Sequence, residues 1–268
     1  MPRAIWSGSI SFGLVNVPVK LYSAISPKDV RFNQLEEGTN QRIRQKRVSA
    51  ATGEEVPYER IVKGYEIAPD QYVVITPEEL EGLDPKATRA IDIEDFVELD
   101  QIDPVHYERP YYLVPEKGAA KAYALLLQAM KESNKVAIAR MVLRTKQYLA
   151  AIRPKGDILC LETMLFADEV VDESELDGVP GDDVEVSERE LKMARQLIES
   201  LSTDFEPEKY HDEYREQVLA LIEAKAEGQV IATQTASEEP AQVVDLMAAL
   251  EASLAAARAA KEQEESGS

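Results

Sequence analysis

The sequence of 268 residues predicts an α+β fold, with most strands in its first half and helices toward its end. Apolar side chains alternate with period two through residues 8–22, which predicts strands. Apolar side chains recur at helical spacing through residues 118–134, which predicts a helix. A chain of this length buries a hydrophobic core in one large domain or two ordinary ones.

The first 115 residues contain most of the predicted strands. The alternation at 8–22 changes phase near Gly13, and Pro18 suggests a sheet edge or a bulge. Thr76 and Glu79 form a capping box, so we expect a short helix from there to Gly82. Further extended segments are expected at residues 30–35, 42–48, 72–75, 91–97 and 111–114.

Strands and helices alternate in the second half of the chain. The run 136–154 is rich in β-branched and other apolar residues and predicts strand structure, as does 158–166. Ser187 and Glu190 form a second capping box, which predicts the start of a long helix. The last expected elements are a helix from Pro207 to about Glu227, stopped by Gly228, a polar linker at 232–242 and an amphipathic helix at 243–260.

Several function classes are excluded by what the sequence lacks. No apolar run approaches the roughly 18 residues of a bilayer-spanning helix, and the start does not resemble a signal peptide, so we expect a cytoplasmic protein. Cys160, His106 and His211 predict neither an internal disulfide nor a structural zinc site. No Walker loop, dinucleotide fingerprint or G-x-S-x-G elbow is present, so no cofactor and no metal are expected.

Charge is distributed unevenly along the chain. The formal net charge of −20 argues against a nucleic-acid partner, because an acidic surface repels phosphate. However, residues 1–64 contain 10 basic and 6 acidic side chains, and residues 119–156 contain 8 basic and 1 acidic. Two basic blocks within an acidic chain can form one positive surface, which favours nucleic-acid binding in a single orientation. The alternative is chance clustering on solvated faces.

Both basic blocks coincide with predicted strands. On a strand at 42–48, Arg42, Arg44 and Lys46 lie on one face about 6.6 Å apart, close to the spacing of alternate phosphates. The same pattern recurs at 140–146. No recognition helix is apparent, so we expect contacts to the duplex backbone rather than to bases. The candidate DNA-contacting residues are Lys20, Arg31, Arg42, Arg44, Lys46, Arg47, Lys135, Arg140, Arg144, Lys146, Arg153 and Lys155.

Several long segments resemble bacterial Ku proteins, in order and over about residues 3–254. They are RAIWSGSISFGLVNVPVKLYSA (3–24), RIRQKRV (42–48), IVKGYE (61–66), IDPVHYERPYYLVP (102–115), KAYALL (121–126), VAIARMVLR (136–144), ELKMARQLI (190–198) and YHDEYREQVLALIEAKAEG (210–228). The resemblance implies a Ku-type β-barrel, an inserted or following helical region and a C-terminal helical arm. It also implies a ring-forming homodimer that threads onto double-stranded DNA ends in non-homologous end joining.

This family implies a division of the chain and a set of partners. The implied parts are a barrel core with DNA-encircling strands at 1–186, a helical arm at 187–231, the polar linker at 232–242, and a ligase-interaction helix with an acidic tail at 243–268. A basic channel inside an acidic exterior would explain the two signs of charge. The implied partners are DNA ends, a second copy of the chain and the bacterial end-joining ATP-dependent DNA ligase. When bound to breaks, the protein is expected at the nucleoid.

Two segments depart from the family pattern. Where relatives often have a Cys-x-x-Cys element, residues 48–53 read VSAATG, so no metal or redox role is expected there. Many relatives end in a lysine-rich tail, whereas residues 261–268 contain one Lys and three Glu. We therefore do not expect secondary DNA contacts from a basic tail.

An apolar stripe marks the C-terminal segment. Its residues are Val243, Val244, Leu246, Met247, Leu250 and Leu254, at spacings near three and four. A stripe that follows a polar linker is typical of a helix that binds a partner's groove, and the similar segment of bacterial Ku is implicated in ligase recruitment. The alternative is a helix that packs back on its own arm.

The leading hypothesis is therefore a DNA-end-binding protein that is not an enzyme. One alternative is a lyase or nuclease at broken ends, with a buried lysine as catalyst or with Mg²⁺ held by the acidic sets Asp92, Glu94 and Asp95 or Asp168 and Glu169. Carboxylates this common in an acidic chain are usually solvated. A second alternative is a β-barrel adaptor for protein partners only, which the net charge favours.

Overall fold

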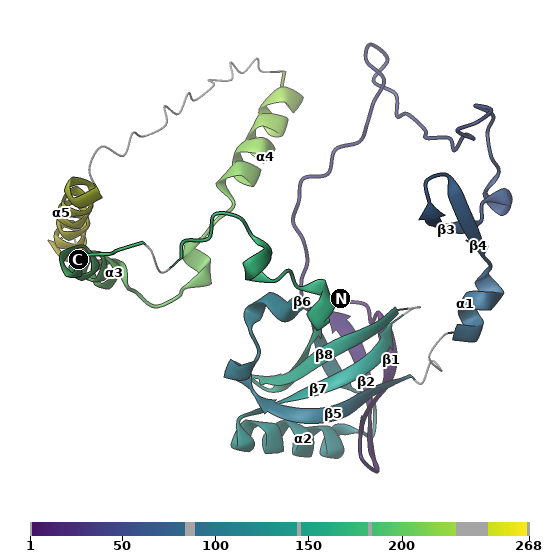
Figure 1. Cartoon of the computed structure of the whole chain (residues 1–268), viewed down its shortest axis with the longest axis horizontal. Coiled ribbons are helices and arrows are strands. Elements are labelled where there is room, and N and C mark those ends of the chain that lie inside the picture. The colour runs from purple at the N-terminus through teal and green to yellow at the C-terminus, as the bar shows by residue number, and fades with distance from the viewer. Residues whose placement is uncertain (1, 84–88, 144–145, 182–183, 229–245, 267–268) are drawn as a thin grey trace. The chain divides into compact units, whose positions relative to one another are not determined.

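The chain folds into two units, a barrel unit and a helical unit (Figure 1). The computed structural model describes residues 2–83, 89–143, 146–181, 184–228 and 246–266. The barrel unit contains Phe32–Asp172 and the residues before Asp29, and the helical unit contains Asp29–Arg31 and the residues after Asp172. The predicted α+β class is confirmed.

The barrel is closed and has the strand order β1-β2-β6-β9-β8-β7-β5. The pair of β1 and β5 is parallel and closes the barrel, whereas all other neighbours are antiparallel. Closure leaves the barrel without a free edge strand. The strands are β1 (Trp6–Phe12), β2 (Val15–Ser23), β5 (Ala90–Glu98), β6 (Tyr107–Pro115), β7 (Lys135–Leu143), β8 (Lys146–Lys155) and β9 (Ile158–Met164).

The phase change near Gly13 is a reversal of the chain. Strand β1 ends at Phe12 and β2 begins at Val15, and Gly13 adopts φ +58°, which glycine tolerates without strain. Ile10 on β1 and Val19 on β2 are both buried. Residues 8–22 therefore form a hairpin whose two strands turn alternate side chains into the barrel.

Helix α2 (Ala120–Ser133) packs against the barrel and shares its hydrophobic core. Its buried face carries Tyr123, Leu126, Leu127 and Met130, at the spacing that predicted the helix. The Tyr123 hydroxyl donates to the Leu113 carbonyl at 2.7 Å and accepts from the Leu159 amide at 2.6 Å. One hydroxyl thus connects α2 to β6 and β9.

Replacing Tyr123 with Phe is expected to lower the free energy of unfolding by about 1–3 kcal/mol, because a buried carbonyl and a buried amide each lose this partner. Urea unfolding measures the effect. Tyr214→Phe is the matched control, since its side chain is 78% exposed. A Tyr123→Phe variant as stable as the parent would contradict this role.

The residues between β2 and β5 contain no barrel strand within the described part of the chain. Strands β3 (Lys63–Ala68) and β4 (Gln71–Ile75) form a separate hairpin, followed by helix α1 (Pro77–Leu83). The first capping box is confirmed, because the Glu79 amide donates to Thr76 Oγ1 and the Thr76 amide to the Glu79 carboxylate. The strands predicted at 30–35 and 42–48 are wrong.

In those two segments the backbone forms only isolated bridges, Leu35 with Arg42 and Val48 with Glu55. A strand requires a neighbour that accepts and donates hydrogen bonds along its length, and the barrel offers none because it is closed. The strand structure predicted at 136–154 is confirmed, but it forms two antiparallel strands, β7 and β8, so Arg140 and Lys146 do not lie on one strand as the ladder expected at 140–146 requires. The connecting residues 144–145 lie outside the described part of the structure.

The helical unit contains α3 (Glu188–Leu201), α4 (Glu213–Ala226) and α5 (Leu246–Ser266). The capping box of Ser187 and Glu190 is confirmed at the start of α3. Pro207 starts only a 3-10 turn, and α4 begins at Glu213, where the Asp212 carboxylate accepts from the Arg215 amide at 2.9 Å. The predicted linker at 232–242 lies outside the described residues. The 3-10 turns are Tyr58–Arg60, Leu99–Gln101, Pro104–His106, Ala167–Glu169, Glu173–Glu175 and Pro207–Lys209.

None of the helices in the described part of the chain is both long and apolar enough to cross a bilayer.

Candidate nucleic-acid interface

The first basic block lies on the segment between β2 and β3. The side chains of Arg42, Arg44, Lys46 and Arg47 are exposed. The ammonium of Lys46 lies 2.6 Å from the Glu55 carboxylate, which compensates its charge. Within the described residues, no carboxylate forms an ion pair with the three arginines.

The three arginines are held by the backbone of a short segment rather than by a strand. The Ile43 amide donates to the Gln34 carbonyl at 3.3 Å, and the Val56 amide donates to the Arg47 carbonyl at 2.8 Å. The Arg47 guanidinium also lies 5.4 Å from the Tyr58 ring centroid. The regular spacing expected on a strand face is therefore absent, but the segment is anchored at both ends.

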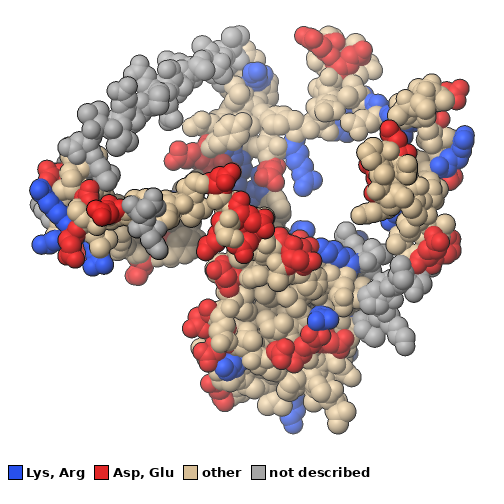
Figure 2. Space-filling model, in the orientation of Figure 1, with Lys and Arg blue, Asp and Glu red and all other residues tan. Residues whose placement is uncertain are grey.

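The second basic block lies on the barrel, where acidic neighbours compensate it. Lys135 on β7 lies 2.9 Å from Glu98 on β5, and Arg140 lies 3.3 Å from Glu94. These contacts follow from the pairing of basic β7 with acidic β5. Acidic and basic side chains are accordingly interspersed on the barrel face seen in Figure 2. The two signs of charge that are separate in sequence thus meet in the barrel.

One further carboxylate, that of Glu169, takes part in this compensation. Lys146 lies 3.5 Å from the carboxylate of Glu169. The pKa of Glu169 lies below its usual value because the Phe166 amide donates to it and Lys146 adds positive charge. The hydrogen bond and charge of Lys135 likewise lower the pKa of Glu98. These acids stay ionised at neutral pH, so a phosphate has to compete with them for both lysines.

Arg153 has a structural partner inside the barrel wall. Its terminal nitrogen lies 2.6 Å from the Glu162 carboxylate, and its Nε donates to the same oxygen at 3.1 Å. The Glu162 side chain is only 12% exposed, and that of Arg153 is 29% exposed. The hydrogen bonds that Arg153 donates to Glu162 raise the pKa of Arg153. Removing either partner would leave a largely buried charge unpaired.

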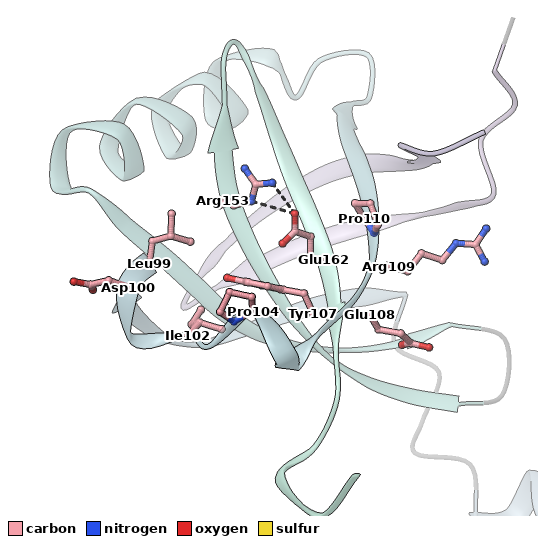
Figure 3. A pocket seen from close by; sticks show the side chains of 10 residues that line it. All are labelled: Leu99, Asp100, Ile102, Pro104, Tyr107, Glu108, Arg109, Pro110, Arg153 and Glu162. Carbon is pink, nitrogen blue, oxygen red and sulfur yellow. Dashed lines mark hydrogen bonds and ion pairs between the residues drawn. The ribbon is translucent and has the colours of Figure 1, made fainter. Parts of the chain in front are cut away.

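Beside this ion pair lies an open cleft of about 650 Å³ (Figure 3). Leu99, Ile102 and Pro104 form an apolar wall, and the buried hydroxyl of Tyr107 has no hydrogen-bond partner among the described residues. Burial raises the pKa of Tyr107, so its hydroxyl remains protonated at neutral pH. The Arg153 cation beside the cleft is already bound to Glu162. Arg153 is therefore not free to bind a phosphate in this cleft.

The remaining candidates are spread over the chain. Lys20 is half-buried on β2, Lys155 is exposed at the end of β8, and Arg31 is exposed in the helical unit. Arg144 lies outside the described residues. Arg42, Arg44 and Arg47 thus stand out as a close group of exposed cations without a carboxylate partner among the described residues. Sequence reasoning missed the compensating acids, because their pairing depends on barrel register.

The carboxylates that the nuclease alternative would use for Mg²⁺ are not gathered into a metal site among the described residues. In the part of the chain that the structure describes, no three His, Cys, Asp or Glu side chains are placed to hold a metal ion. Two members of those sets, Glu94 and Glu169, are instead the ion-pair partners of Arg140 and Lys146.

The predicted ligase-interaction stripe lies partly on α5. Met247, Leu250 and Leu254 are half-buried there, and α5 packs against α3. Val243 and Val244 lie outside the described residues, as does the side chain of Leu246. The helix therefore packs back on its own arm, which is the alternative that the sequence left open.

Comparisons with known proteins agree with this architecture. The profile of the "Ku70/Ku80 beta-barrel domain" matches residues 11–193. A "Non-homologous end joining protein Ku" from Anaeromyxobacter sp. (strain K) is 54% identical over 259 residues, covering 96% of this chain and 87% of the relative. "Non-homologous end joining protein Ku 1" of Saccharopolyspora erythraea is 46% identical, covering 96% and 80%. The barrel, the matched profile and these identities together show that the chain belongs to the Ku family.

Proposed function

We propose that this protein binds the ends of linear double-stranded DNA, without sequence preference, as a homodimeric ring in non-homologous end joining. The observation that carries the proposal is the exposed group of Arg42, Arg44 and Arg47 on a member of the Ku family. Two relatives whose alignments cover 96% of this chain are named for the same repair process. The proposal assigns no reaction to the chain itself and places it in the cytoplasm, at the nucleoid when breaks are present.

Binding without sequence preference is supported by how the arginines are displayed. They project from an irregular segment, not from a helix that fits the major groove. Guanidinium groups bind phosphate oxygens in a bidentate way, and contacts to phosphates carry no sequence information. Lys135, Arg140 and Lys146 are secondary candidates, because each has to give up a carboxylate before it can bind DNA.

A second copy of the chain is supported by apolar side chains that this chain leaves exposed. On the β3–β4 hairpin, Tyr65 is 71% and Tyr72 is 58% exposed. An isolated two-stranded hairpin is at best marginally stable in water. In the helical unit, the stacked rings of Phe205 and Tyr210 are also largely exposed. We propose that dimerisation buries part of this surface.

The dimer is expected to be present without DNA. Sedimentation at micromolar concentration should give a mass near twice the 29.9 kDa of one chain. A protein that is monomeric in solution and also binds DNA as a monomer would contradict the proposed dimeric ring.

The experiment that tests the function is a competition between linear and covalently sealed forms of one plasmid for the full-length protein. A protein that needs a free end distinguishes the two forms, because their backbones and sequences are identical and only the linear form has ends.

We further propose that residues 243–268 recruit the end-joining ligase. Deleting residues 241–268 is expected to reduce stimulation of the ATP-dependent end-joining ligase of the same genome at least tenfold, while DNA-end binding changes less than twofold. The physical reason is that the stripe of Met247, Leu250 and Leu254 is removed and the barrel is untouched. Joining assays and gel shifts with one linear duplex measure both effects. Full stimulation by the truncated chain would locate the ligase contact elsewhere.

A further inference from the structure

The stripe on α5 is turned toward α3. Met247, Leu250 and Leu254 are half-buried, whereas the other described side chains from Ala248 to Ala256 are exposed. At the edge of this face, the Glu251 carboxylate lies 3.5 Å from Arg189 at the start of α3. The residues proposed to bind the ligase are therefore the residues that α5 uses to pack on its own chain.

Helix α3 presents a matching face. Met193, Ala194 and Leu197 are half-buried and recur at the spacing of one helical face. Ile198, the residue after Leu197, points away from this face and is 66% exposed. The α3 face thus offers α5 an apolar surface of the kind that a partner's groove would offer.

The pairing of α3 with α5 is loose. No α3 side chain is fully buried, and the three stripe residues of α5 are only half-buried. The side chains of the Arg189–Glu251 ion pair are 77% and 58% exposed, and such exposed pairs contribute little to stability. A groove that encloses the stripe completely would bury more apolar surface than α3 does and would therefore replace it.

We propose that α3 and the partner ligase compete for the same stripe, so that α3 holds the C-terminal helix in a closed state. This inference rests on the ligase contact proposed above. Only chains with α5 released are competent to bind, so the apparent affinity for the ligase is reduced by the released fraction. The loose packing makes the closed state reversible.

The test uses the full-length protein with Leu197→Glu, which places a charge in the α3 face and leaves the stripe unchanged. Ile198→Glu is the matched control, because it adds the same charge on the exposed side of α3. Hydrogen exchange by mass spectrometry reports the release of α5. Biolayer interferometry with the ATP-dependent end-joining ligase of the same genome reports its affinity.

In Leu197→Glu, amides of residues 247–256 are expected to exchange at least tenfold faster, and the dissociation constant for the ligase is expected to fall roughly three- to tenfold. Ile198→Glu should change neither. Unaltered exchange in Leu197→Glu overturns the closed state. Faster exchange with unchanged or weaker ligase binding overturns the competition, while the ligase contact itself stands. If deletion of residues 241–268 leaves ligase binding intact, the proposed contact fails and the competition falls with it.

Discussion

A linear plasmid is expected to compete for the protein roughly 100-fold better than the same plasmid sealed into a relaxed circle. A closed ring passes over a free end and is then retained by the duplex, whereas a sealed circle offers only contacts to the outside of the ring. Those outer contacts give the micromolar or weaker affinity of non-specific binding. Gel shifts with a labelled 30-base-pair duplex, competed by each plasmid form, measure the ratio.

The control for this experiment is the linear duplex with a bulky protein cap on both ends. Capping both ends before the protein is added should abolish binding. Capping them after the protein has bound should trap the ring on the DNA. Equal competition by the linear and sealed plasmids would contradict the proposal that the ring threads onto DNA ends. The absence of binding to either form would instead favour an adaptor for protein partners.

Changing Arg42, Arg44 and Arg47 together to Ala is expected to weaken binding to linear duplex about 100-fold at 0.15 M salt. Each lost phosphate contact lowers the magnitude of the slope of log affinity against log salt by about 0.9, so the six contacts that a homodimer loses, three per chain, lower it by about 5.4. None of the three arginines forms an ion pair with a carboxylate in the described structure, so their removal leaves no acid unpaired. Titration at several salt concentrations measures both quantities.

The matched control removes the same charge elsewhere on the barrel unit. Arg89, Lys117 and Lys121 are exposed and lie outside the proposed interface. Their joint change to Ala should lower affinity less than threefold and leave the salt slope almost unchanged. If both triple variants stay folded and lose the same affinity, binding depends on total charge and not on the arginine segment.

Local signals in the sequence predicted local structure well. Both capping boxes form as expected, because each depends on side chains only three residues apart. The reversal between β7 and β8 was missed because neither Arg144 nor Thr145 is a residue type that is common in turns. Alternation at 42–48 predicted a strand, but alternation describes side chains only and provides no neighbouring backbone to pair with.

The candidate interface was predictable in composition but not in detail. The two basic blocks are visible in the sequence, and the first of them carries the group on which the proposal depends. Lys135 and Glu98 are 37 residues apart, and they meet only because β7 pairs with β5 in one register. The same holds for Arg153 on β8 and Glu162 on β9, which form an ion pair because these two strands are neighbours in the barrel. Ion pairs of this kind require the topology to be known first.

The parallel pair that closes the barrel also determines when the barrel can form during synthesis. Ser9 pairs with Ala90, and the wall is complete only after β9, which ends at Met164. At roughly 5–20 residues per second, a ribosome needs on the order of ten seconds to make the intervening chain. During that interval Ile10, Val19 and Leu21 of the first hairpin, which are buried in the finished barrel, are exposed to solvent. Nascent chains are therefore expected to bind chaperones before β9 emerges, and fragments that stop short of it should aggregate instead of forming a smaller barrel.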